Sequence, residues 1–215
     1  MTLRFKSTII AAGILAAAPA LAMTGATVAT DLNLRAGPGP QYVIEGVIPA
    51  AAAVEVLGCV ETAEWCEVTF DGMTGYAYAP YLVAAEAAEP APIDVTTVET
   101  VTFDETNDGF SALIGGSTAA GAAALLAAGP VGIAAAGVVG AIAAERADPD
   151  PVTVTYVTEN PVEPVFVTGE PVVGVTVPGE VAVATIPESE FVYANLNGNL
   201  VLIDAESRQI VRVVR

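Results

Sequence analysis

Residues 32–40 constrain the fold of this chain more than any other stretch, because a strand pattern in them ends abruptly in turn residues. Apolar and polar side chains alternate over residues 32–35, which predicts a short strand with one buried face. The sequence Gly-Pro-Gly-Pro follows at 37–40. Because Gly37 and Gly39 are free to take positive φ and proline fixes φ, the strand is expected to end in a tight turn.

The residues that follow repeat this pattern of short strands divided by turns. Asp71-Gly72 is a strong signal for a two-residue hairpin turn. Short strands at such close spacing are typical of a small barrel or sandwich. The predicted strands are 42–48, 54–59, 65–70 and 75–78.

This stretch resembles the bacterial Src-homology 3 (SH3-type) domain, and the resemblance implies a small SH3-like β-barrel at residues 26–83. Two departures stand out: Tyr76 replaces the usual Trp, and alanines at 50–53 replace a polar, often Lys-bearing turn. The motifs that carry the resemblance are Leu-Asn-Leu-Arg-Ala-Gly-Pro-Gly at 32–39, Trp-Cys-Glu-Val at 65–68, Gly-Met-Thr-Gly-Tyr-Ala at 72–77 and Tyr-Leu at 81–82.

The resemblance also implies a binding role, because aromatic rows on SH3-type folds line peptide grooves and bacterial members are associated with cell-wall peptides. An alternative stays open, in which Trp65 and some tyrosines form the core and Arg35 pairs with an acid. Whether Tyr42, Tyr76 and Tyr78 lie at the surface is equally open. The candidate ligand-binding residues are Asn33, Arg35, Tyr42, Trp65, Tyr76, Tyr78 and Tyr81.

Residues 1–22 have the parts of a secretory signal peptide: Arg4 and Lys6, then an apolar run, then Ala-Leu-Ala at 20–22. The apolar run is too short for a membrane span, so we expect export to the periplasm or cell envelope. Loss of the leader's two positive charges takes the net charge from −18 to −20. Such a surface repels phosphate, and nucleic acid is therefore not an expected partner.

Cys59 and Cys66 are the two cysteines of the chain, and they lie on consecutive predicted strands. A hairpin brings such residues within disulfide range, and an oxidising compartment favours the bond. A redox-active or metal-binding pair is the weaker alternative, because the Cys-x-x-Cys spacing and histidine are absent from the sequence.

An acidic Ala/Pro/Thr linker is predicted at 84–110, within which 94–103 has the pattern of an isolated strand. An Ala/Gly-rich hydrophobic segment follows at 111–145, and Gly129-Pro130 divides it. The leading prediction is a helical hairpin in or against a membrane, because small residues allow close helix packing. A soluble hairpin, a self-associating segment and a disordered linker stay open as alternatives.

Residues 152–215 are predicted to form a β-rich C-terminal domain that ends in a meander. The predicted strands include 152–157 and a hairpin of 191–196 with 199–203, joined by an Asn197-Gly198 turn. This part resembles the bacterial domain-of-unknown-function family 1236, which implies an architecture and an exported compartment but no activity. The motifs are Pro-Val-Glu-Pro at 161–164, Gly-Glu-Pro-Val-Val-Gly at 169–174, Tyr-Ala-Asn-Leu-Asn-Gly at 193–198, Leu-Ile-Asp at 202–204 and Arg-Gln-Ile-Val at 208–211.

The sequence contains no recognisable catalytic constellation: histidine, the commonest general base, is absent. We therefore expect no enzyme activity, no metal and no cofactor. The predicted fold class is mainly β with an Ala/Gly-rich helical segment. The predicted function is an exported, non-enzymatic envelope protein whose SH3-like domain binds peptidoglycan peptides or an envelope protein. The alternative is a structural, membrane-associating or self-assembling protein acting through 111–145.

Cell fractionation tests the membrane prediction for 111–145. The protein, expressed with its leader, is separated into soluble, membrane and cell-wall fractions, and the membranes are washed with carbonate. If the segment is inserted, the protein stays with the washed membranes. Recovery in the soluble or cell-wall fraction contradicts insertion.

Overall fold

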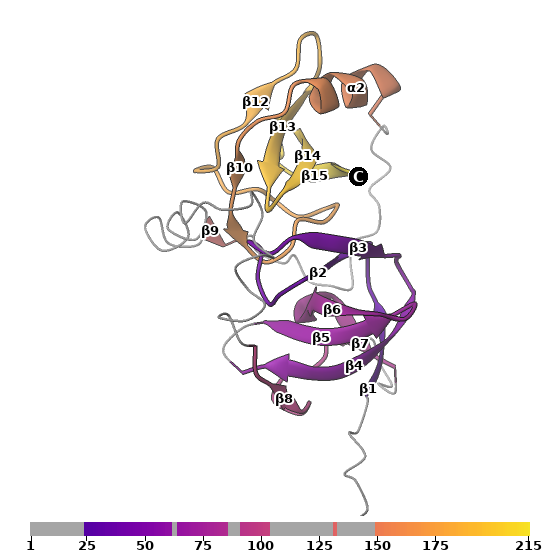
Figure 1. The fold of residues 1–215 in the computed structure, drawn as a ribbon. Coiled ribbons are helices and arrows are strands. Elements are labelled where there is room, and N and C mark those ends of the chain that lie inside the picture. Colours follow the sequence, from indigo (N-terminus) through magenta and orange to yellow (C-terminus); the bar gives the residue numbers. More distant parts are fainter. Residues whose placement is uncertain (1–23, 62–63, 86–90, 104–130, 133–148) are drawn as a thin grey trace, which may run out of the picture.

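The computed structural model describes residues 24–61, 64–85, 91–103, 131–132 and 149–215. These residues form two β-rich units that lie one against the other, with a single helix on the C-terminal unit (Figure 1). The mainly β fold predicted from the sequence is confirmed. The predicted signal peptide, 1–22, and nearly all of the Ala/Gly-rich segment, 111–145, lie outside the described residues.

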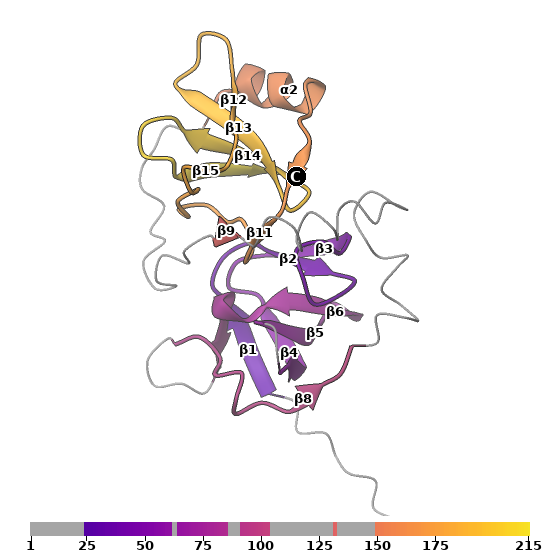
Figure 2. The same ribbon diagram turned by 90° about the vertical axis from the view of Figure 1, so that its left-hand side faces the viewer.

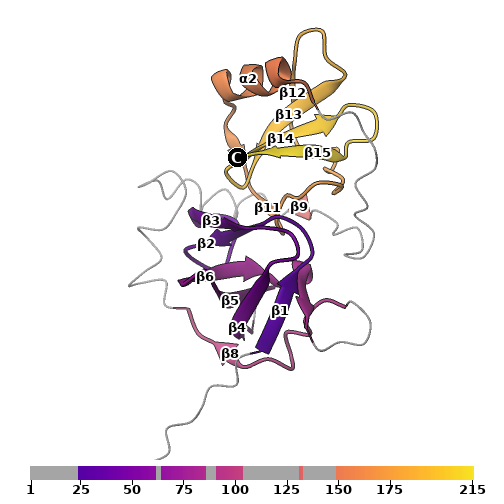
Figure 3. The ribbon, with the colours of Figure 1, turned by 90° about the vertical axis from the view of Figure 1, so that its right-hand side faces the viewer.

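The N-terminal unit is a small barrel made from one strongly bent, mostly antiparallel sheet (Figure 3). Its strand order is β3-β2-β6-β5-β4-β1-β7, and a short 3-10 turn, η1 (Ala79–Tyr81), precedes β7. The predicted strands are therefore confirmed to within a few residues. The bounds are β1 Thr24–Val28, β2 Leu32–Arg35, β3 Ile44–Ile48, β4 Ala53–Val60, β5 Trp65–Phe70, β6 Met73–Tyr78 and β7 Leu82–Ala84.

The turn predicted between β5 and β6 forms as expected: Asp71 and Gly72 both have positive φ, of 49° and 78°. The turn predicted after β2 also forms, but neither Gly37 nor Gly39 takes positive φ in it. Gly37 is required for space instead. A Cβ at this position would lie 2.6 Å from the ring of Tyr42, which packs on the turn after β2.

The predicted disulfide between Cys59 and Cys66 is present and joins directly opposed residues of β4 and β5. The bond closes a short loop across the hairpin. In the chain-entropy model such a loop restricts the unfolded chain enough to add about 2 kcal/mol of stability. For a barrel of this size, whose core is small, that contribution is substantial.

The described part of the predicted linker, residues 91–103, lies against the barrel rather than apart from it. Within it, β8 (Thr100–Val101) pairs parallel with β4, so the strand is not isolated as expected. Ile93 is buried in the barrel core, and Phe103 packs against that core. The apolar residues spaced along this Thr-rich stretch pack on the barrel. The acidic composition of the stretch, by contrast, predicted an exposed linker.

The C-terminal unit begins with a helix, α2 (Pro151–Glu159), where the sequence predicted a strand at 152–157. Two features of the preceding residues explain the difference. The Asp150 carboxylate accepts hydrogen bonds from the backbone N–H groups of Val152 and Thr153, which caps the helix. Pro151 occupies the first turn, where its missing N–H costs nothing. This capping overrides the strand preference of the β-branched residues that follow.

After α2 the chain forms a twisted sheet in which β13, β14 and β15 make the predicted meander (Figure 2). The β13–β14 turn has positive φ at both Asn197 (54°) and Gly198 (83°), which confirms the predicted hairpin geometry. The bounds are β10 Pro164–Val165, β11 Val167–Thr168, β12 Ala184–Thr185, β13 Phe191–Leu196, β14 Asn199–Asp204 and β15 Ile210–Val214; β11 also pairs with β9, Val131–Gly132.

The cores of the two units are continuous. One cluster of buried apolar residues includes Leu34 and Trp65 of the barrel together with Val167, Val172 and Leu196 of the C-terminal unit. A smaller cluster, with Val157 and Phe191 among its members, lies under α2. The two units therefore share one apolar core and are not independently packed domains.

No helix within the described ranges is long and apolar enough to span a membrane.

The role of Gly37 can be tested by measuring the free energy of unfolding in urea. Substitution G37A places a methyl group against the ring of Tyr42, and such overpacking typically costs about 1–3 kcal/mol. Gly179 is the matched control, because a Cβ there meets no atom within 4 Å. We expect G179A to be neutral or slightly stabilising, and equal losses in both variants would contradict the packing argument.

Candidate functional site

Both faces of β2 are buried, and this decides where the candidate site lies. Leu32 and Leu34 point into the barrel core, as the alternation predicts. Asn33 and Arg35, on the opposite face, are also almost fully buried, at 1% and 0% exposure. The C-terminal unit covers this polar face of β2 (Figure 2).

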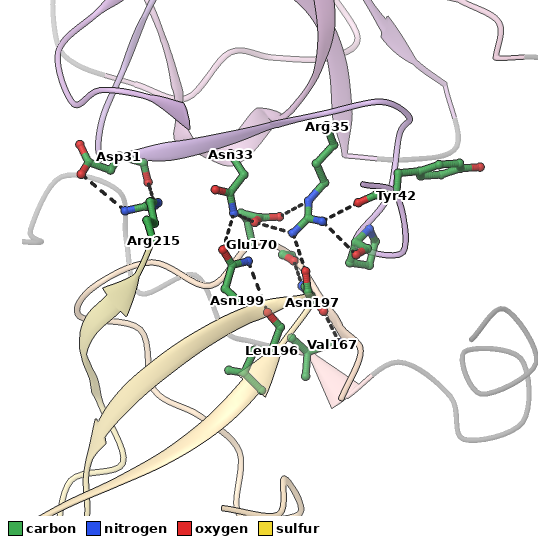
Figure 4. A network of polar contacts seen from close by, with 12 residues as sticks. Asp31, Asn33, Arg35, Tyr42, Val167, Glu170, Leu196, Asn197, Asn199 and Arg215 are labelled. Carbon is green, nitrogen blue, oxygen red and sulfur yellow. Dashed lines mark hydrogen bonds and ion pairs between the residues drawn. The ribbon is translucent and has the colours of Figure 1, made fainter. Parts of the chain in front are cut away.

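Arg35 uses all five of its N–H donors, and it is held from two sides (Figure 4). Within the barrel, Nη1 donates to the carbonyl oxygens of Pro40 (3.1 Å) and Tyr42 (2.7 Å). From the C-terminal unit, Glu170 accepts from Nε (2.9 Å) and Nη2 (2.7 Å), and the carbonyl of Asn197 accepts from Nη2 (3.0 Å). The turn at 36–42 thus fixes the guanidinium in place, which gives the Gly-Pro-Gly-Pro sequence a structural purpose.

Glu170 forms a bidentate ion pair with Arg35 in which neither side chain is exposed to solvent. The carboxylate is carried by a turn in which Gly169 has φ of +87°. Asn197 clamps this turn, because its Oδ1 accepts from the N–H of Val167 and its Nδ2 donates to the carbonyl of Gly169, each at 2.8 Å. The type I′ turn of the C-terminal hairpin therefore positions the acid that meets the barrel.

Asn33 completes this polar cluster. Its Nδ2 donates to Glu170 and, at 3.2 Å, to Oδ1 of Asn199. Its Oδ1 is buried and has no hydrogen-bond partner among the described residues. A buried acceptor without a donor costs free energy. Glu170 therefore pairs with Arg35 and with Nδ2 of Asn33, but leaves the Oδ1 of Asn33 without a hydrogen bond.

The five aromatic candidates are buried too, and they form two groups. Tyr42 and Tyr76 both contact the ring of Phe103 edge-on, at 5.2 and 5.4 Å between ring centres. Trp65, Tyr78 and Tyr81 form a row with neighbouring ring centres 5.5 and 5.7 Å apart. The question left open by the sequence is thereby answered, because none of these rings is presented freely to solvent.

Burial changes the acidity of the aromatic row. It raises the pKa of Tyr81 to about 12, and the negative charge of Glu170 adds to this. The pKa of Tyr78 is also raised, first by burial and then by the hydrogen bond that its hydroxyl donates to Glu64 at 2.7 Å. Tyr78 further lies against Gly169, whose ideal Cβ position is 3.4 Å from the tyrosine ring. The row therefore borders the same contact between barrel and C-terminal unit.

The structure brings Asn33 and Arg35 together as one polar pair and places Tyr78 and Tyr81 beside it. Sequence reasoning missed the residues that meet them, Glu170, Asn197 and Asn199. Glu170 and Asn197 stand in motifs quoted for the C-terminal resemblance, but no sequence signal linked them to β2. The ligand-binding role of the seven candidates remains a prediction, and the alternative of an acid partner for Arg35 describes the observed contact.

Within the described ranges, no cluster of three or more His, Cys, Asp or Glu side chains could hold a metal ion. The acidic residues of the described surface are spread over both units.

Comparison with known families matches two parts of the chain. Residues 30–83 match the family described as bacterial SH3 domain, and residues 156–215 match the family described as domain of unknown function (DUF1236). No curated protein matches the chain at a significant level. Both resemblances inferred from the motifs are therefore confirmed.

The raised tyrosine pKa values predict a loss of stability at high pH. Tyr81 is neutral in the folded state up to about pH 12, whereas in the unfolded chain it ionises near pH 10.0. The contribution of neutral Tyr81 to the free energy of unfolding is fully present below the pKa of the unfolded chain. This contribution is lost as pH rises from about 10 to about 12, at no more than about 1.4 kcal/mol per pH unit.

Urea unfolding across this pH range measures the effect. We expect Y81F to weaken the dependence on pH. A wild-type stability that stays level over the whole range would contradict the argument.

Proposed function

Because the chain carries a bacterial SH3 domain at residues 30–83 and a DUF1236 domain at residues 156–215, we propose that it is an exported, non-enzymatic binding protein of the cell envelope. Its partner is a peptide of the peptidoglycan or a protein of the envelope. Bacterial SH3 domains commonly mediate binding to such partners, and the domain is compatible with an extracellular or envelope location.

The observation that carries this proposal is the guanidinium of Arg35, held in a fixed orientation by the barrel's own turn. Such a group recognises a planar acceptor by two parallel hydrogen bonds, which is a device of molecular recognition.

Export is supported by two independent features. The leader at residues 1–22 has the parts of a signal peptide. The Cys59–Cys66 bond is of a kind that persists in oxidising compartments such as the periplasm. The strongly acidic composition disfavours phosphate-bearing partners such as nucleic acid.

The non-enzymatic part of the proposal rests on the sequence. The chain has no histidine, the most common general base, and both cysteines form the disulfide, so a free thiol nucleophile is lacking too. If the purified protein showed a catalytic activity, and this activity survived replacement of every plausible pair of carboxylates, the protein would be an enzyme that does not use carboxylate chemistry. That result would contradict the proposal of a pure binding protein.

A second candidate function acts through residues 111–145. Residues 109–144 carry no charge and are rich in Ala and Gly, which favours membrane association or self-assembly. In that case the function lies in residues 111–145, and the barrel and the C-terminal domain are only attached to this segment. The fractionation described above separates this candidate from the first.

Binding to purified peptidoglycan tests the main proposal. The mature, oxidised full chain is incubated with the insoluble material, and the retained fraction is measured after sedimentation. We expect retention of the wild type and a loss in R35K, because lysine lacks the fork that binds two acceptor atoms at once.

Arg215 provides the matched control, because it is a partly exposed arginine whose contacts are with Asp31 and not with the cluster around Arg35. Variant R215K should be retained like the wild type, and circular dichroism verifies that each variant is folded. Absence of retention for the folded, oxidised wild type would refute binding to the cell wall.

A further inference from the structure

We propose that the polar face of β2 is a receptor for the free C-terminal carboxylate of a peptide, and that Glu170 of the same chain occupies this receptor as an internal competitor. The inference rests on the proposed binding function and adds to it the chemical class of the ligand and the means of regulation.

The barrel alone supplies the receptor. The carbonyl groups of Pro40 and Tyr42 hold Nη1 of Arg35, so the orientation of the guanidinium does not depend on the C-terminal unit. Nε and Nη2 then form a fork that faces outward from the barrel and donates hydrogen bonds to two carboxylate oxygens. Nδ2 of Asn33 adds a third donor to the same carboxylate. Three convergent donors around one anionic group make a built site.

The occupant comes from a distant part of the sequence. Glu170 is 135 residues from Arg35, and it reaches the barrel on the Gly169 turn that Asn197 clamps (Figure 4). Its carboxylate is 0% exposed. The contact has the form of a ligand presented to a receptor: a single acid on a tight turn, inserted between an arginine and an asparagine of the other unit.

The unpartnered Oδ1 of Asn33 shows which ligand would fit better than Glu170. This atom is an acceptor beside the carboxylate site, and a glutamate side chain has no donor to offer it. A peptide that ends in a free carboxylate carries the amide N–H of its last residue a short distance from that carboxylate. Such a ligand can satisfy the fork of Arg35 and the orphaned acceptor of Asn33 together.

Exchange of one carboxylate for another is compatible with the energetics of a buried ion pair. Desolvation of the two charges offsets most of their attraction, so the native pair adds little net stability, whereas removing one partner leaves a costly buried charge. A peptide carboxylate that replaces Glu170 keeps Arg35 paired throughout. The ligand must, however, displace the packed segment that includes Val167 and Val172. The affinity of the wild type for the peptide is therefore reduced by the fraction of molecules in which this segment has moved away from β2.

Calorimetric titration of the full chain tests the inference. The probe is N-acetyl-alanyl-alanine with a free carboxylate, and the same compound with a C-terminal amide is its control. Variant E170Q removes the competing negative charge and leaves Arg35 in need of a partner. We expect E170Q to bind the free acid at least about tenfold more tightly than the wild type, and not to bind the amide.

Glu163 is the matched control, because it is an exposed glutamate on the same stretch before β10. Variant E163Q makes the same change of charge and should bind like the wild type. Equal affinities in all three proteins, or equal binding of the acid and the amide by E170Q, would overturn the inference.

A second variant covers the case in which E170Q does not fold. N197G keeps the positive φ of the turn and removes the side chain that clamps Val167 and Gly169. It should also raise the affinity for the free acid, and an unchanged affinity in the folded variant would overturn the inference.

The outcome is separable from that of the proposed function. Binding of the free acid by E170Q without retention of any variant on peptidoglycan would reject the cell wall as partner and keep the receptor. Retention on peptidoglycan with no effect of E170Q would reject the receptor and keep the envelope role.

Discussion

The buried ion pair between Arg35 and Glu170 is the contact on which the arrangement of this protein depends. A charged pair withdrawn from solvent is tolerated only when its remaining donors and acceptors are satisfied. Here the turn at 36–42 satisfies two donors of Arg35 from the barrel, and Asn197 and Glu170 satisfy the other three from the C-terminal unit. The geometry of three distant segments is thus fixed by one guanidinium.

This contact turns two recognisable domains into one folded unit. The polar face of β2, which a barrel of this type would present to a partner, is covered by the C-terminal domain, and the apolar cores meet beside it. The candidate binding residues Asn33 and Arg35 are therefore the same residues on which the C-terminal domain docks. The domain of unknown function covers this face of its SH3-type neighbour, and its Glu170 and Asn197 pair with the buried Arg35.

Much of the fold follows from local sequence signals. The turns at Asp71-Gly72 and Asn197-Gly198 form as predicted, since each places two residues that tolerate positive φ between strand patterns. The helix at Pro151–Glu159 was predicted as strand, because its β-branched residues weighed more than the capping signal at Asp150. The burial of the candidate aromatics cannot be predicted from the sequence, since a tyrosine pattern is the same in a core and in an open groove.

The sequence by itself determined the short strands β2 to β6 of the barrel, the disulfide, the C-terminal meander and the presence of a charged residue on β2, because each depends on residues close together along the chain. Only the tertiary structure decided what faces that charge. Glu170 and Arg35 are 135 residues apart, and many acidic residues of this chain could have been the partner. The choice depends on how the Asn197 turn presents Gly169 and Glu170 to β2, which is a property of packing and has no signature along the sequence.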